Sequence, residues 1–203
     1  MKIALIGISG RVGSRLAAEL LLRGHTLTGI ARDISKVDVR SGVILKEIDV
    51  NQSEALVLLL EGYDVVISST SFATTNPLAV IHAVKKAGIP RLMVVGGAGS
   101  LEVSPGMVLV DTPEFPEAYK PEAHGGAEFL KALISEKELD WTFLSPSAEF
   151  NPGERTSTYR LGGDQLLIDA EGRSWISMED FAIAFVDELE YPKHSCQRFT
   201  VGY

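Results

Sequence analysis

Three glycines near the N-terminus constrain the fold of this chain more than any other feature. Gly7, Gly10 and Gly13 directly follow the apolar run KIALI and precede a segment whose leucines recur on one helical face. This spacing predicts a strand, a tight turn and a helix. Gly7 permits the turn, Gly10 lets a pyrophosphate approach the backbone, and Gly13 lets the helix pack on the strand. Since the first N–H groups of a helix attract anions, we predict a dinucleotide-binding unit, with a ligand-free glycine-rich turn as the alternative.

The rest of the chain alternates short apolar runs with helical patterns. Strands are predicted at 25–31, 42–50, 64–70, 91–97 and 141–146, and helices at 53–62, 77–88 and around 127–137. The segment between the second and third strands is short for a full helix. Buried strands joined by crossovers form a parallel sheet with helices on both sides. The sequence therefore predicts an α/β fold, a Rossmann-type doubly wound parallel sheet.

The last quarter of the chain has a different character. Turn signals at 162–163 and 171–172 separate short strand-like runs. The segment SMEDFAIAFVDELE predicts a helix with Ser177 as its N-cap and Asp180 three residues later, as in a capping box. The segment RFTVG predicts a final strand.

Length and composition suit one globular domain. The chain has 203 residues, of which 45% are hydrophobic and 23% charged. We find no linker and no internal repeat, and therefore interpret residues 1–203 as a single dinucleotide-binding domain. Within it, residues from about 147 to 203 are predicted to form a small C-terminal appendage over the substrate cleft.

Charge and hydropathy argue against several kinds of partner. The net charge of −8 is opposite to what a nucleic-acid surface or an anionic lipid surface requires. The apolar N-terminal run is too short for a secretory signal, and no stretch reaches the ~18 apolar residues of a membrane span. We therefore expect a cytoplasmic protein. The lone cysteine, Cys196, is expected to be a buried or inert thiol, and no metal site is predicted.

The end of the second predicted strand bears on the choice of cofactor. An NAD-binding protein often places an acid there, on the ribose hydroxyls. This chain has Arg32 instead, and a guanidinium can pair with a 2′-phosphate; Arg11 in the glycine loop could reach the same group. We therefore favour NADP over NAD. The alternative is that Arg32 is a solvated charge and that Asp33 takes the role of the acid.

Further candidate contacts follow from the position of ligands beyond the carboxyl ends of the strands. Asp49 either frames the adenine edge together with Val50 or serves as a turn or cap residue. The other candidates stand in the glycine loop or after a predicted strand: Ser9, Val12, Ser69, Thr70, Gly97, Pro146 and Ser147. Ser100 is a catalytic candidate near the nicotinamide. Phe150 and Tyr159 are either stacking surfaces or core residues.

With these motifs in place, the chain resembles the short-chain dehydrogenase/reductase superfamily in its atypical branch. It is most similar to NADH-flavin reductase-like and biliverdin reductase B-like proteins, with NmrA-like proteins as relatives. The resemblance rests on GISGRVGSRL and GIAR at the cofactor end, on DVVISST and MVVGGAGSL, and on the more specific block LDWTFLSPSAEFNPGERTSTYRLGGDQLL. It implies an NADP-type Rossmann fold that acts on a flavin, a quinone or a similar acceptor.

One segment bears on catalysis, because ordinary members of this superfamily use a tyrosine and a lysine four residues apart on a helix. Here Tyr119 and Lys120 are adjacent and precede Pro121, so we predict loop residues that cannot form that pair. His124 is a better candidate, since biliverdin reductase B-like proteins resemble this chain in having a histidine there and histidine can relay a proton near neutral pH. A helix residue that caps or packs is the other interpretation of His124.

The function expected from this reasoning is NADPH-dependent transfer of hydride to a flavin, quinone or similar small aromatic acceptor. Such acceptors need little acid catalysis, so a chain with an intact cofactor loop and no tyrosine–lysine pair fits this function. The first alternative is an NADP-binding redox sensor without turnover, and a weaker one is an epimerase or isomerase with bound cofactor. The expected partner is a small molecule, with flavin as a possible substrate, and the expected state is a monomer or homodimer.

Overall fold

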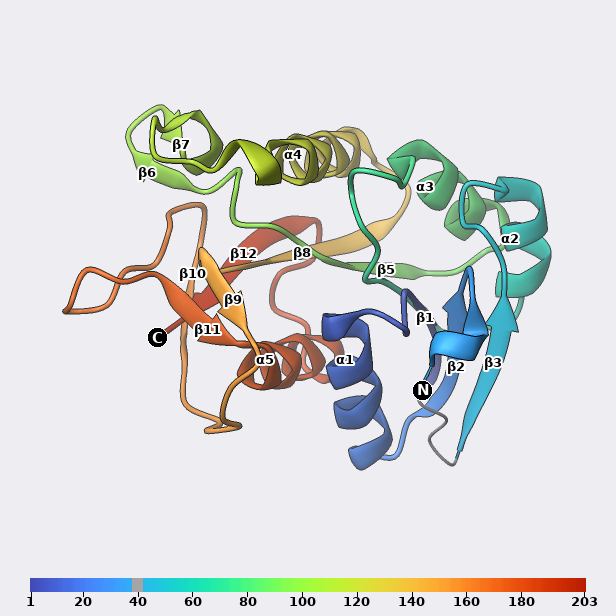
Figure 1. Cartoon of the computed structure of the whole chain (residues 1–203). Coiled ribbons are helices and arrows are strands. Elements are labelled where there is room, and N and C mark those ends of the chain that lie inside the picture. The colour runs from blue at the N-terminus through green and yellow to red at the C-terminus, as the bar shows by residue number, and fades with distance from the viewer. Residues whose placement is uncertain (38–41) are drawn as a thin grey trace.

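The computed structural model describes residues 1–37 and 42–203 (Figure 1). Its centre is an eight-stranded sheet with the order β10-β12-β8-β5-β4-β1-β2-β3. The strands are β1 (Lys2–Ile6), β2 (Thr26–Ala31), β3 (Val43–Glu47), β4 (Val65–Ser68), β5 (Arg91–Val95), β8 (Asp140–Pro146), β10 (Arg160–Gly162) and β12 (Gln197–Gly202). Neighbouring strands pair in parallel, apart from β10, which runs antiparallel to β12. The strands predicted from the sequence are all present.

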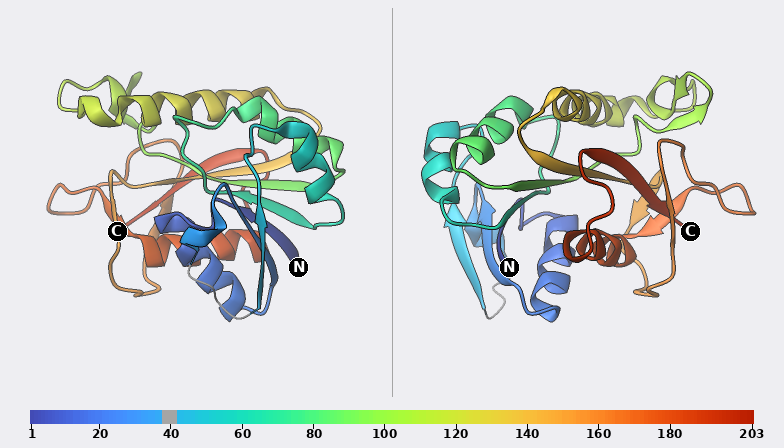
Figure 2. Two further views of the ribbon diagram at one scale, coloured as in Figure 1. Left: turned by 45° about the vertical axis from the view of Figure 1, so that its right-hand side comes forward. Right: turned by 180° about the vertical axis from the view of Figure 1, so that it is seen from behind.

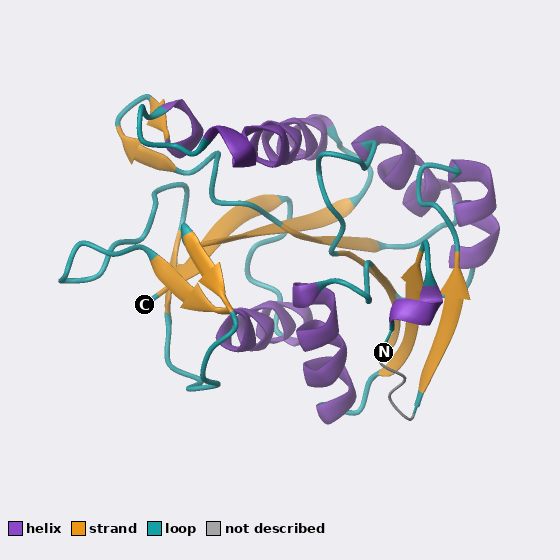
Figure 3. Cartoon of the chain, in the orientation of Figure 1, coloured by secondary structure: helices purple, strands orange, loops and turns teal. Residues whose placement is uncertain are grey.

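Helices cover both faces of the sheet (Figure 2, Figure 3). The helices on one face are α1 (Arg11–Leu22) and α5 (Met178–Glu190), and those on the other are α2 (Ser53–Leu60), α3 (Pro77–Lys86) and α4 (Lys120–Ser135). In β1, Ile3 and Leu5 join the core beside α1 and α5, whereas Ala4 and Ile6 join the opposite core. Because successive strand residues face opposite sides, burial on both faces requires a continuous apolar run. The predicted doubly wound α/β fold is confirmed.

The strand order reverses between β1 and β4, at the middle of the sheet. The chain leaves β1 for α1 on one face and leaves β4 for α3 on the opposite face. The loops after these two strands therefore diverge and open a crevice at the carboxyl ends of the strands. Ligands of doubly wound folds bind at this switch point.

Residues 147–203 contribute to several parts of the fold. Strands β10 and β12 extend the main sheet, and α5 packs against α1. A separate parallel pair is formed by β9 (Glu149–Asn151) and β11 (Trp175–Ser177). This pair lies next to the C-terminus, where the Tyr203 N–H donates to the Trp175 carbonyl (Figure 1).

The predicted N-cap of α5 is confirmed, because Ser177 Oγ accepts a hydrogen bond from the Asp180 N–H at 3.0 Å. The Asp180 carboxylate has a different role from that of a capping box. It is fully buried and accepts hydrogen bonds from the N–H groups of Thr156 and Ser157, each at 2.8 Å. Its second oxygen accepts from the Thr156 hydroxyl and from the Tyr203 hydroxyl. Asp180 thus holds the loop before β10 on α5.

A hairpin that the sequence did not predict lies between β5 and α4. It consists of β6 (Glu102–Ser104) and β7 (Met107–Val108), and Gly106 forms its turn at a φ of +76°. The hairpin contacts the C-terminal region, because the Glu102 N–H donates to the Asp164 carbonyl and the Leu166 N–H donates to the Glu102 carbonyl. The short strands lack the alternating apolar pattern by which a strand is recognised in a sequence.

Two local predictions are wrong. Tyr119 ends a 3-10 helix, Glu117–Tyr119, and Lys120 is the first residue of α4 with helical φ and ψ of −57° and −42°, so neither is a loop residue. Pro121 is second in α4, where its missing N–H breaks no helical hydrogen bond. Cys196 is exposed and has a φ of +53°, so its expected burial is not observed, while the inertness of its thiol stays a prediction.

The connection from β2 to β3 contains a short 3-10 helix, Ile34–Lys36, and residues 38–41 lie outside the described part. Within residues 1–37 and 42–203, no helix combines the length and the apolar character needed to cross a membrane.

Candidate nucleotide-binding site

A pocket occupies the crevice between the loops that follow β1 and β4. Four segments line it, each at the carboxyl end of a neighbouring strand. They supply Gly7, Ser9 and Gly10 after β1, Ile30, Ala31 and Arg32 at the end of β2, Ile48 to Asn51 after β3, and Ser69 to Ser71 with Thr74 and Thr75 after β4. The polar part of the lining consists of backbone, hydroxyl and amide groups together with Arg32 and Asp49, and aliphatic side chains such as Ile30, Ile48 and Val50 complete it. Such polar groups suit the polar parts of a nucleotide.

The glycine loop has the geometry of a phosphate cradle. Gly7 has a φ of +87°, and a Cβ placed on it would come 2.1 Å from the Ser69 carbonyl oxygen. Gly10 is the N-cap of α1, so no side chain caps the first N–H groups of that helix, and no acidic residue lies in its first turn. These N–H groups are therefore available to an anion at the positive end of the helix dipole. The residues present fit the pyrophosphate of a dinucleotide.

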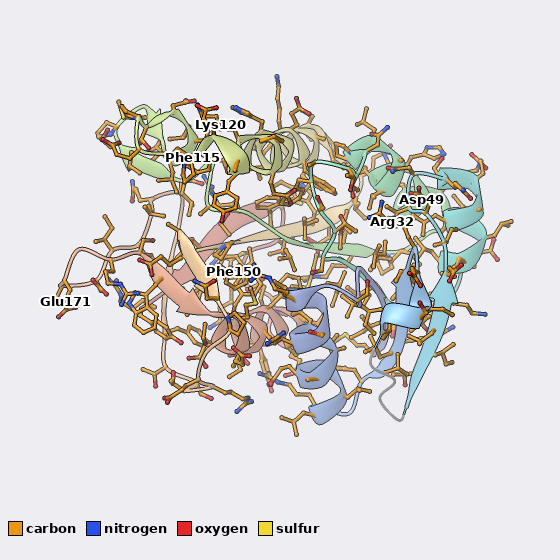
Figure 4. The ribbon with its side chains drawn as sticks, in the orientation of Figure 1. Arg32, Asp49, Phe115, Lys120, Phe150 and Glu171 are labelled. Carbon is orange, nitrogen blue, oxygen red and sulfur yellow. The ribbon has the colours of Figure 1, made fainter. Side chains whose placement is uncertain are left out.

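Arg32 lies at the pocket, and Figure 4 shows it beside Asp49. Its exposed guanidinium has no hydrogen bond or ion pair within the part of the chain that the structure describes. The carboxylate of Asp33 instead accepts from the N–H and hydroxyl of Ser35, at 3.0 and 2.6 Å, and caps the short 3-10 helix. Arg11 is exposed at the first position of α1 and lies outside the pocket lining.

Asp49 has the turn role that the sequence left open, and it also lines the pocket. Its Oδ1 accepts from the Asn51 N–H at 3.0 Å. Asn51, which sequence reasoning missed, joins two walls of the pocket. Its Nδ2 donates to the Thr74 carbonyl at 3.0 Å, and its Oδ1 accepts from the Asn76 N–H at 2.9 Å. An asparagine two residues after Asp49, shortly beyond the strand, was the available signal, since both residue types favour turns. Val50 is buried and contributes to the pocket wall.

The catalytic candidates are not among the residues that line this pocket. His124 is exposed in the second turn of α4 and has no hydrogen bond or ion pair among the described residues. Ser100 is half-buried, and Arg198 approaches its hydroxyl at 3.4 Å while donating to Asp164 at 2.6 Å. Tyr119 is 65% exposed. The structure therefore does not bring His124 and Ser100 together through any hydrogen bond.

Several other predicted contacts have structural roles in this arrangement. Gly13 is buried where α1 meets the glycine loop, and Val12 packs partly against the core. Ser147 is buried and donates to the Val201 carbonyl at 3.0 Å; Pro146 ends β8 beside it. Gly97, half-buried after β5, lies near the Phe72 ring. None of these five residues lines the pocket as described.

The two aromatic candidates are engaged within the protein. Phe150 of β9 packs on Phe181 of α5 with 4.8 Å between ring centroids, and Figure 4 shows it toward the C-terminal region, far from Arg32. The Tyr159 hydroxyl donates to the Asp187 carboxylate. Burial, followed by that hydrogen bond, raises the pKa of Tyr159, so its proton stays on the phenol.

Known proteins share the sequence and the fold over the whole chain. The YwnB protein of Bacillus subtilis (strain 168) is 42% identical over 211 residues, covering 99% of this chain and 98% of that protein. A crystal structure from Bacteroides thetaiotaomicron, described provisionally as an epimerase, is 44% identical with a TM-score of 0.93 and covers 100% of this chain and 96% of its own. A structure from Streptococcus pneumoniae TIGR4, described provisionally as an NADH-flavin reductase, is 33% identical with a TM-score of 0.85 and covers 100% and 99%.

The likeness to NADH-flavin reductase-like proteins that the sequence motifs indicated is confirmed by the Streptococcus pneumoniae relative. A family model described as NAD(P)H-binding matches residues 7–192, from the first glycine of the loop to the end of the last crossover. The chain belongs to this NAD(P)H-binding family.

Proposed function

We propose that this protein is an NADPH-dependent oxidoreductase that transfers hydride to a flavin, a quinone or a similar small aromatic acceptor. The observation that carries the proposal is an intact nucleotide pocket beside a helix α4 that lacks a tyrosine–lysine pair on one face. Tyr119 and Lys120 are adjacent, and Ala123 stands four residues after Tyr119. A carbonyl reductase needs an acid at this position, whereas a quinoid acceptor does not.

The chain's own residues would bind and orient rather than donate protons. A reduced nicotinamide supplies the hydride when it is bound. The glycine loop and the walls around Asn51 and Ser69 would hold the dinucleotide at the end of the sheet, and proximity would provide most of the rate effect. His124 can assist a proton transfer because its ring is exposed and unpaired among the described residues.

The preference for NADPH over NADH is assigned to Arg32. Its guanidinium lies at the pocket and has no acid paired with it within residues 1–37 and 42–203. A 2′-phosphate would accept charge-assisted hydrogen bonds from it. The side chain of Asp33, which could have held ribose hydroxyls instead, is bonded to Ser35.

The comparisons support a reductase and also suggest a second candidate function. The provisional description of the Streptococcus pneumoniae relative names an NADH-flavin reductase, which agrees with the proposal. The provisional description of the Bacteroides thetaiotaomicron relative names an epimerase, so an epimerase with bound cofactor is the second candidate. A sensor that binds NADP without turnover is the third.

The proposal is tested by NADPH oxidation under anaerobic conditions with FMN, riboflavin and menadione as acceptors. We expect a steady loss of absorbance at about 340 nm, the band of the reduced nicotinamide, that requires both protein and acceptor. Tight binding of NADPH without oxidation by any acceptor would contradict the reductase and favour the epimerase or the sensor. Inactivity without NADPH binding would contradict all three.

A further inference from the structure

The first turns of α4 hold the segment that follows β4, and one carboxylate provides the polar contacts. Glu122 accepts hydrogen bonds from Ser71 Oγ at 2.7 Å, from the Phe72 N–H at 2.8 Å and from the Ala73 N–H at 3.1 Å. Both carboxylate oxygens are used. Hydrogen bonds to an ionised acceptor are roughly twice as strong as neutral ones. Glu122 is therefore tied firmly to a segment that is remote from it in sequence.

Two glycines let the same segment pack closely on α4. A Cβ placed on Gly125 would come 2.7 Å from the Phe72 carbonyl oxygen, and one placed on Gly126 would come 3.1 Å from the Phe72 ring. The Phe72 ring is buried, stacks on Phe143 with 6.0 Å between centroids and meets Phe129 edge-on at 5.7 Å. The contact between α4 and this segment thus has an apolar anchor as well as the carboxylate.

The segment held by α4 continues the wall of the nucleotide pocket. Ser71 itself lines the pocket, as do Ser69 and Thr70 before it and Thr74 and Thr75 after it. Phe72 and Ala73 stand between these pocket residues and face α4. Glu122 is absent from the pocket lining and is joined to it through the Ser71 hydroxyl and the N–H groups of Phe72 and Ala73.

We infer that Glu122 is a positioning residue that fixes the 69–75 wall of the pocket before the dinucleotide arrives. This inference rests on the proposed binding of NADPH in the pocket. A wall that is already ordered costs less conformational entropy when a ligand binds. Without the carboxylate, the wall would become ordered only when the cofactor binds, and this ordering would lower cofactor affinity. Such a loss would occur although no residue that lines the pocket has changed.

The test is NADPH titration by fluorescence, at a temperature well below the melting temperature of each variant. Glu122→Gln should weaken NADPH binding about tenfold, because an amide nitrogen cannot accept from the N–H groups of Phe72 and Ala73. Glu128→Gln is the matched control, since Glu128 is exposed on the same helix and has no hydrogen bond or ion pair among the described residues. It should bind NADPH as the wild type does.

A double-mutant cycle separates positioning from a general loss of stability. Ser71→Ala should weaken NADPH binding by itself. It should have little further effect in the Glu122→Gln background, because both substitutions disrupt the same contact between Ser71 and Glu122. Additive effects of the two on NADPH affinity would overturn the inference. Should Glu122→Gln fail to fold, wild-type NADPH affinity in Ser71→Ala would overturn it as well.

Gly125→Ala is an independent disruption of the same contact that keeps the charge of Glu122. It should weaken NADPH binding because its Cβ displaces the Phe72 backbone. If Glu122→Gln and Gly125→Ala both bind NADPH like the wild type, the inference fails while the proposed function stands. If the wild-type protein binds no NADPH, the proposed function fails and the inference fails with it.

Discussion

A Cβ atom placed on Gly13 would come 2.1 Å from the carbonyl oxygen of Gly7, so α1 can start where it does only because residue 13 has no side chain. Gly13→Ala should push α1 away from the glycine loop. We expect the free energy of unfolding to fall by about 1–3 kcal/mol, the usual cost of overpacking, and NADPH affinity to fall with it. Urea unfolding and NADPH titration measure the two effects.

Gly163 offers a control for this substitution, because a Cβ there would meet nothing within 4 Å. Gly163→Ala should unfold at the same urea concentration as the wild type and bind NADPH equally well. Equal behaviour of Gly13→Ala and Gly163→Ala would show that the close approach to Gly7 is not required.

Arg32 is expected to set the choice of cofactor. The loss of a charge-assisted contact to a 2′-phosphate costs about 1.5–3 kcal/mol. Arg32→Ala should therefore weaken NADPH binding roughly 10- to 150-fold and leave NADH binding nearly unchanged. Lys131→Ala, which removes an exposed positive charge from α4, controls for net charge. Titration in which Arg32→Ala weakens both cofactors equally would refute the assignment.

His124 is expected to assist turnover without being essential. Its ring is exposed and lies outside the pocket, and a flavin or quinone can take its proton from water. His124→Ala should lower the turnover number about tenfold or less, whereas Tyr119→Phe should be close to neutral. Steady-state kinetics at saturating NADPH measure both. Inactivation of a folded Tyr119→Phe would mean that Tyr119 is catalytic, and loss of NADPH binding in His124→Ala would mean that His124 holds the cofactor.

Asp180 makes stability depend on pH. Burial alone would raise its pKa, but hydrogen bonds from Thr156, Tyr203 and Ser157 outweigh burial and lower the pKa below the ordinary value of 3.8. A carboxyl whose folded pKa is depressed stabilises the fold above its unfolded pKa, and this contribution is lost as the pH falls through the folded pKa.

Asp180→Asn should accordingly have a lower free energy of unfolding than the wild type at about pH 7. As the pH falls from about 7 to about 3, the variant should lose less of this free energy than the wild type does. Asp111→Asn is the control, since Asp111 is exposed and has no hydrogen bond or ion pair among the described residues. Urea unfolding at several pH values measures the difference. Parallel pH profiles for the wild type and Asp180→Asn would contradict the account.

The sequence predicted the sheet and its main helices well because burial on both faces leaves continuous apolar runs, as in β1 and β4. It also predicted the cofactor loop, since a phosphate cradle needs glycine at fixed spacings. The hairpin β6–β7 was missed because its strands are short and largely exposed. Lys120 was placed in a loop because the residue before a proline usually avoids helical geometry, which the first turn of α4 overrides.

Part of the site could not be read from the sequence, since it depends on contacts between remote segments. Asn51 bridges two pocket walls through Thr74 and Asn76, and Glu122 holds the segment 71–73. Neither residue belongs to a spacing motif. Both are polar residues whose partners lie more than twenty positions away, and only the packed fold places them together.

The central claim is hydride transfer from NADPH to a flavin-like acceptor, and isotope transfer tests it most directly. NADPH carrying deuterium at C4 of the nicotinamide is incubated with the protein and a 5-deazaflavin, whose reduced carbon does not exchange with water. The account predicts that deuterium passes to the deazaflavin from one face of the nicotinamide only, because a dinucleotide bound in one orientation would present a single face to the acceptor. NADPH that binds tightly and transfers no deuterium would contradict it.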